Sequence, residues 1–178
     1  RELDEVVKTV RKLVDESKKE SDDVAREARE LLEKLERESE EVVRRVRELV
    51  KELKKKRDDE RLDRVVKDIL KKVEDLIREL REVNKETRKK VERLVKELER
   101  VNREIRERVE RIMDVLRRGD VDVDEVLRKA KELIDDSRRL IEDVKRRLKE
   151  LIDRDRRLIE RVLEEAERLI RELDEEAR

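Results

Sequence analysis

An 18-residue repeat occurs nine times along this chain. The middle third divides into three aligned blocks, which start at Val65, Val83 and Val101, and the first and last thirds divide in the same way from Val6 and Val123. Because 18 residues make about five turns of an α-helix, the apolar stripe returns to the same face without drifting. The repeat therefore predicts three long, nearly straight helices and no supercoil.

Two interruptions of the repeat predict turns. Residues 117–124 read RRGDVDVD, in which Gly119 suits the left-handed residue that closes a helix and Asp122 suits the cap of the next helix. Glu125 lies three residues after Asp122 and completes a capping box. Residues 56–60 read KRDDE, in which Asp58 or Asp59 is expected to cap a helix start.

Turns this short join antiparallel neighbours. We therefore expect an all-α fold, a straight, antiparallel, up-down-up three-helix bundle that is like a coiled coil but untwisted. The helices are expected at about 2–56, 59–118 and 122–177, with about 54 residues each and a length of about 80 Å. One domain is expected to cover residues 1–178, and the turns leave the handedness of the bundle open.

The composition suits long helices and excludes several classes of function. Charged residues make up 61% of the chain and hydrophobic ones 34%, as expected when each helix needs only a stripe of apolar residues. The absence of Pro and the single Gly argue against disorder. The 54 basic residues balance the 54 acidic ones, so nucleic acid is not an expected partner. No apolar run is long enough for a membrane span, and no targeting signal fixes the compartment. We expect a soluble chain that is cytoplasmic on recombinant expression.

Catalysis, cofactors and metals find no support in the residues present. The chain has no His, no Cys and no aromatic residue, which removes the usual general base, thiolate chemistry, common metal ligands and stacking platforms. The basic run at residues 51–57, KELKKKR, is followed by Asp58, Asp59 and Glu60 and is interpreted as a solvated helix surface. We therefore expect no enzyme activity, no cofactor, no metal and no catalytic residue.

Polar residues stand in several columns that are otherwise apolar. With the middle repeats centred on each other, facing residue numbers sum to about 124 for the first two helices and about 241 for the last two. The polar residues then form two layers: Ser17, Ser21, Asn102 and Ser137 in one, and Ser39, Asn84, Thr87 and Asp155 in the other. We interpret both layers as structural devices that fix the register of the helices. A polar pocket with Asp155 as its lone acid is the functional alternative, and Asn84 and Asn102 at a half-exposed stripe edge are a third reading.

On its repeats, caps, balanced charge and restricted alphabet, the chain resembles de novo designed, parametrically generated, untwisted three-helix bundles over residues 3–176. The resemblance implies a hyperstable monomer that needs no partner and serves as a designed structural scaffold without natural biochemical activity. The alternative function is an assembly or helix-binding module, in which an exposed helical face around Leu127, Leu140 and Leu163 recruits a second copy or a partner helix.

Overall fold

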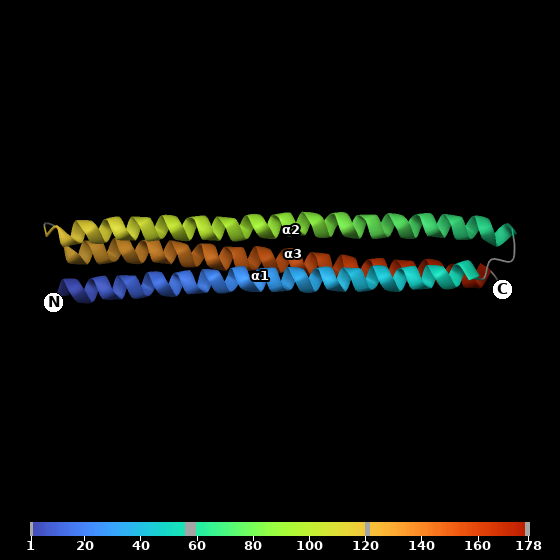
Figure 1. Cartoon of the computed structure of the whole chain (residues 1–178), viewed down its shortest axis with the longest axis horizontal. Coiled ribbons are helices and arrows are strands. Elements are labelled where there is room, and N and C mark those ends of the chain that lie inside the picture. The colour runs from blue at the N-terminus through green and yellow to red at the C-terminus, as the bar shows by residue number, and fades with distance from the viewer. Residues whose placement is uncertain (1, 56–59, 120–121, 177–178) are drawn as a thin grey trace. The chain divides into compact units, whose positions relative to one another are not determined.

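The computed structural model describes residues 2–55, 60–119 and 122–176 of the chain. This part contains three helices and no strand: α1 (Glu2–Lys55), α2 (Glu60–Arg117) and α3 (Val123–Glu176) (Figure 1). The predicted all-α, up-down-up three-helix bundle is confirmed, and the predicted helix ends agree to within one residue.

The three helices form two compact units, and every helix contributes one segment to each unit. Unit 1 comprises Arg1–Glu30 and Lys90–Lys149, and unit 2 comprises Leu31–Lys89 and Glu150–Arg178. In each unit the α2 segment runs antiparallel to the segments of α1 and α3. The organisation of residues 1–178 as one domain stays a prediction.

Unit 2 has a core of aliphatic side chains from all three helices. Leu35 of α1 and Leu80 of α2 have no exposed surface, and Val162 and Ala166 of α3 are buried beside them in the same cluster. Removing such apolar surface from water is the dominant favourable contribution to folding. The half-buried Val50 and Leu70 pack at the edge of this cluster.

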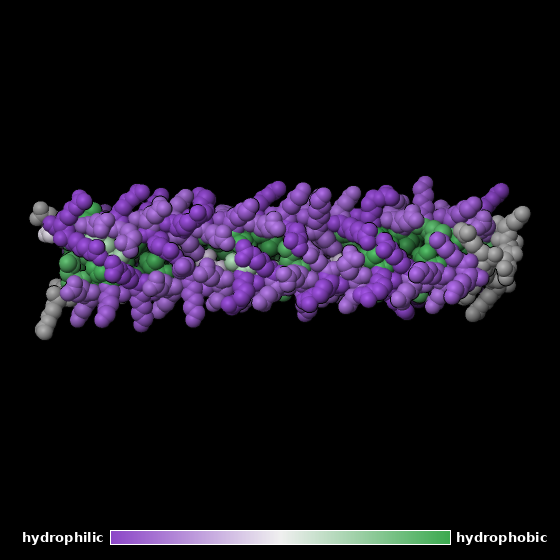
Figure 2. Space-filling view, in the orientation of Figure 1, coloured by the Kyte–Doolittle hydropathy of each residue, from purple (hydrophilic) through white to green (hydrophobic). Residues whose placement is uncertain are grey.

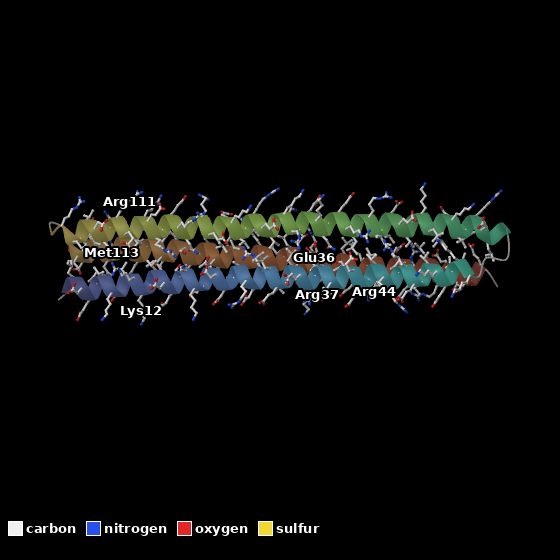
Figure 3. All side chains as sticks on the ribbon, in the orientation of Figure 1. Lys12, Glu36, Arg37, Arg44, Arg111 and Met113 are labelled. Atoms are coloured by element: carbon white, nitrogen blue, oxygen red, sulfur yellow. The ribbon has the colours of Figure 1, made fainter. Side chains whose placement is uncertain are left out.

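Unit 1 has its own cluster, built on Val10 of α1, Val109 and Met113 of α2, and Ala130 of α3. Met113 lies between α2 and α1, whereas Lys12 and Arg111 point to the outer sides of their helices (Figure 3). The apolar stripe of each helix therefore faces its neighbours and the charged residues face solvent, as the periodicity predicts.

One contact in each unit agrees with the register expected between neighbouring helices. In unit 2 both Nε and Nη2 of Arg88 donate to the Glu36 carboxylate, at 2.8 and 2.7 Å, and Glu36 lies on the side of α1 that faces α2 (Figure 3). Their residue numbers sum to 124, the value expected from the aligned repeats. In unit 1 the Ser137 hydroxyl donates to Oδ1 of Asn102 at 3.2 Å, and these numbers sum to 239, close to the expected 241.

The turn between α2 and α3 has the predicted closing and capping residues. Gly119 has a φ of 93°, a conformation that favours glycine. Oδ1 of Asp122 accepts a hydrogen bond from the backbone N–H of Asp124 at 3.1 Å, which satisfies one free donor at the start of α3. The Glu125 carboxylate lies 3.7 Å from Nζ of Lys129 in an ion pair along the helix, and its part in a capping box with Asp122 stays a prediction. The expected caps Asp58 and Asp59 lie outside the described residues.

Replacing Gly119 by Ala is expected to lower the free energy of unfolding by about 1 kcal/mol, because an L-residue is strained at positive φ. The added Cβ would meet no atom within 4 Å, so backbone strain is the whole effect. Guanidinium denaturation measures it. Gly119→Asn is the control and should lose less, since Asn tolerates this conformation better. Equal stability of Gly119→Ala and the parent would contradict the positive φ assigned to Gly119.

Candidate functional site

The polar side chains of unit 1 form a hydrogen-bonded group inside the bundle. The hydroxyls of Ser17 and Ser137 are 2.8 Å apart, and Ser137 donates to Oδ1 of Asn102 at 3.2 Å. Ser17, Ser21 and Ser137 are buried, and Asn102 is half-buried. The structure thus brings α1, α2 and α3 together through Ser137. No charged group takes part in these bonds, so they favour a structural role.

The polar side chains of unit 2 are arranged differently. Ser39 donates to the carbonyl of Leu35 in its own helix at 3.0 Å, a local bond that makes no link to α2 or α3. Asp155 has no exposed surface, and one carboxylate oxygen lies 3.9 Å from Nε of Arg154. Oγ1 of Thr87, also fully buried, has no hydrogen-bond partner among the described residues. Oδ1 of the half-buried Asn84 likewise has none in this part of the chain.

Replacing Ser137 by Ala is expected to lower the free energy of unfolding by about 1 to 2 kcal/mol, because the Ser17 hydroxyl and the Asn102 carbonyl then lose their shared partner inside the bundle. Urea denaturation measures the loss. The matched control is Thr9→Ala, which removes an exposed hydroxyl bonded at 2.8 Å to the carbonyl of Glu5. This control should change stability by less than about 0.5 kcal/mol. A Ser137→Ala variant as stable as the control would show that the group contributes nothing.

The described residues contain no group of three or more His, Cys, Asp or Glu side chains that could hold a metal ion. A hydrogen bond from Arg146 lowers the pKa of Asp143, and one from Arg168 lowers the pKa of Glu165. Both directions are opposite to the raised pKa that a carboxylic acid needs in order to donate a proton near neutrality. These carboxylates are surface ion-pair partners.

A groove of about 650 Å³ lies between α1 and α2 in unit 2. Its apolar floor consists of the half-buried Val50 and Leu70 together with the buried Val73 and Ile77. Its rims carry six basic side chains, Arg47, Lys51, Lys54, Arg78, Arg81 and Lys85, against two acidic ones, Glu74 and Glu82. All eight rim side chains are exposed. The groove therefore combines an apolar floor with a local excess of positive charge on a chain whose net charge is zero.

The space-filling view shows the same alternation on the molecular surface. Hydrophobic side chains appear in the groove between helices, and hydrophilic side chains cover the outer sides (Figure 2). Over the described ranges, no helix is both long enough and apolar enough to cross a bilayer.

The exposed helical face expected around Leu127, Leu140 and Leu163 is not observed, because these three leucines are half-buried. They lie at the edge of the apolar stripe, where neighbouring helices cover part of each side chain. Among the residues whose burial the structure describes, the exposed large hydrophobic ones are Leu31 and Val115, with 36% and 45% of their surface exposed. Two separate side chains make no continuous apolar face. The groove of unit 2 is thus the stronger candidate for a binding surface.

Residues 32–114 match the family model of the C-terminal region of G protein-coupled receptor kinase-interacting protein 1. The matched segment is less than half of the chain and runs from α1 through most of α2. No match was found among curated proteins or among solved structures.

This match overturns the expected role of the chain as a designed scaffold without natural biochemical activity. The matched family is a region of a natural protein that is named for an interaction, so the main functional prediction is wrong and the alternative of an assembly or helix-binding module is favoured. The physical reason for the error is that a regular repeat and a restricted alphabet determine the fold and leave function to surface sites.

Proposed function

We propose that the chain is a protein-interaction module that binds an amphipathic helix with acidic flanks in the groove between α1 and α2 of unit 2. The observation that carries the proposal is the groove itself, with an apolar floor between rims of six basic and two acidic side chains. Binding of a helix by its apolar face in such a groove is a recurring mode of peptide recognition.

The spacing of the floor residues matches an α-helical partner. On α2, Leu70, Val73 and Ile77 follow each other at intervals of three and four residues, and Val50 lies opposite them on α1. The lining of the groove extends along α2 from Leu70 to Lys85, a length of about 22 Å at 1.5 Å per residue. A partner helix of about 15 to 18 residues would therefore fill the groove.

The charge of the rims favours an acidic partner. Opposite charges along an interface accelerate association and select among partners. Arg78 is already in an exposed ion pair with Asp75, with Nη1 3.3 Å from Oδ1, and an exposed pair of this kind is readily exchanged for a new partner. Because the rim charges are exposed, added salt should screen the attraction and weaken the complex.

The family match covers the groove that we propose as the binding site. The groove residues on α1 span 47–54 and those on α2 span 70–85, so both sets lie inside the matched segment 32–114. The protein after which that family is described is named for its interaction with a receptor kinase. We likewise propose that this chain binds a partner and catalyses no reaction.

Fluorescence anisotropy with a synthetic peptide tests the proposal. The probe is a labelled helix of about 18 residues with Leu at intervals of three and four and Glu along both flanks. We expect saturable binding that weakens between low and physiological salt. The control is the same peptide with Lys in place of Glu, which should bind at least about tenfold more weakly because like charges then face each other. Equal binding of both peptides, or none, would overturn the proposal.

The sequence also allowed for binding between two copies of the chain through a helical face. The C-terminal stretch at residues 158–176 carries eight acidic and three basic side chains, but its apolar side chains Val162, Ala166 and Leu169 are buried in the core of unit 2. A folded second copy therefore does not offer this stretch to the groove as a free amphipathic helix. We therefore propose that the chain is a monomer. Sedimentation equilibrium should give the mass of one chain at all concentrations, and a mass that rises with concentration would assign the apolar surface to contacts between copies.

A further inference from the structure

Unit 1 has a groove at the repeat-equivalent position of the groove in unit 2. It is lined on α1 by Arg11, Val14, Asp15 and Lys18, and on α2 by Arg106, Val109, Glu110 and Met113. Each of these positions is 36 residues, or two repeats, from a position that lines the groove of unit 2. The two grooves are therefore built on the same columns of the repeat and can be compared residue by residue.

Most paired positions carry similar side chains. Arg11 corresponds to Arg47, Val14 to Val50, Lys18 to Lys54, Val109 to Val73, Glu110 to Glu74, and Met113 to Ile77. Two pairs differ in character. Asp15 stands where unit 2 has Lys51, and Arg106 stands where unit 2 has Leu70.

Both differences act against an acidic amphipathic helix in unit 1. The half-buried Leu70 offers apolar surface to the floor, whereas Arg106 is exposed and places a charge there. Lys51 attracts an acidic flank, and Asp15 repels it. The unit 1 groove is also smaller, about 230 Å³ against about 650 Å³.

We propose that Lys51 and Leu70 are the specificity-determining residues that confine binding of the acidic helix to the groove of unit 2. The inference rests on the proposed function and goes beyond it, because it names two side chains that differ between lining positions shared by the two grooves. It follows that one chain binds one peptide, although the fold repeats the groove.

The loss variant carries the unit 1 residues in unit 2, as Lys51→Asp with Leu70→Arg. Titration calorimetry with the acidic peptide should show binding weakened by about 10- to 100-fold, since both the buried leucine contact and the charge attraction are removed. Both positions lie outside the fully buried core, so helical circular dichroism should match the parent. If the double variant loses helicity, the single change Lys51→Glu tests the same assignment. It should bind the acidic peptide more weakly than the parent, and the difference should be larger at low salt.

The gain variant carries the unit 2 residues in unit 1, as Asp15→Lys with Arg106→Leu. We expect the stoichiometry to rise from one peptide per chain to two, with the new site weaker because its groove is smaller. The matched control makes the same two kinds of exchange at exposed positions of unit 1 outside both grooves, Asp22→Lys with Arg103→Leu, and should keep one site with the parent affinity. A gain variant that stays at one peptide under saturating conditions would overturn the assignment.

The outcomes separate this inference from the proposed function. If the parent binds no acidic peptide, the proposed function itself fails. If the parent binds and the loss variant binds equally well, the groove assignment of Lys51 and Leu70 fails while helix binding stands. If the parent already binds two peptides, the two grooves are equivalent and the inference fails.

Discussion

Replacing Leu80 by Ala is expected to lower the free energy of unfolding by about 2 to 5 kcal/mol, the largest effect on stability that we expect from any single change described for this chain. Leu80 has no exposed surface and packs in the aliphatic core of unit 2. The loss has two parts. The removed methyl groups no longer contribute their free energy of burial, and a cavity remains because a closely packed core relaxes only in part. Guanidinium denaturation followed by circular dichroism measures it.

The control for this change is Leu31→Ala, which truncates the same side chain at an exposed position. We expect this variant to lose less than about 1 kcal/mol, because much of the Leu31 side chain already contacts water. Similar losses for the two leucines would contradict the burial that the fold assigns to Leu80.

Replacing Thr87 by Val is expected to raise the free energy of unfolding by about 1 to 3 kcal/mol. The Thr87 side chain is fully buried, and its hydroxyl has no hydrogen-bond partner among the described residues, so the cost of removing it from water is not offset. Val replaces the hydroxyl by a methyl group of similar size, which suits the site. Thermal and denaturant unfolding both report the change.

The matched control is Thr87→Ser, which keeps the hydroxyl and deletes the methyl group. It should be about 1 kcal/mol less stable than the parent, since a buried methyl is lost. If Thr87→Val is instead the less stable variant, the hydroxyl donates or accepts a bond in solution. The polar side chains of unit 2 would then contribute to stability, as we expect of Ser137 in unit 1.

The fold was predictable because the repeat carries the helix period in every block. Val65, Val83 and Val101 return to one face, and Gly119 and Asp122 mark the turn with residues whose backbone preferences are specific. The register also follows from the alignment of the repeats, as the contact between Glu36 and Arg88 shows. Local chemistry and long-range packing point to the same structure in this chain.

The binding groove was harder to predict, because it depends on which stripe edges stay accessible after packing. Leu127, Leu140 and Leu163 have the sequence pattern of an exposed face, yet neighbouring helices cover part of each. Leu70 has the same pattern and lines a groove. The basic run at 51–57 was interpreted as a solvated helix surface. That interpretation missed the groove, because Lys51 and Lys54 lie on its rim.

The polar residues show a similar division between pattern and geometry. Column positions place Ser17, Asn102 and Ser137 together, and hydrogen bonds join them. The same columns place Ser39 near Asp155, but Ser39 bonds to its own helix. A hydroxyl can choose between a neighbouring helix and its own backbone, and that choice depends on side-chain rotamers that periodicity does not encode. The resemblance to designed bundles stays a prediction.

Methyl NMR of the Ile-, Leu- and Val-labelled chain, titrated with the acidic amphipathic peptide, shows directly which groove the peptide occupies. We expect saturable shifts of the methyl signals of Val50, Leu70 and Ile77, which line the groove of unit 2, while those of Val14 and Val109 in the equivalent groove of unit 1 stay in place. Shifts confined to Val14 and Val109, or no saturable shift at any of these methyl groups, would contradict this expectation.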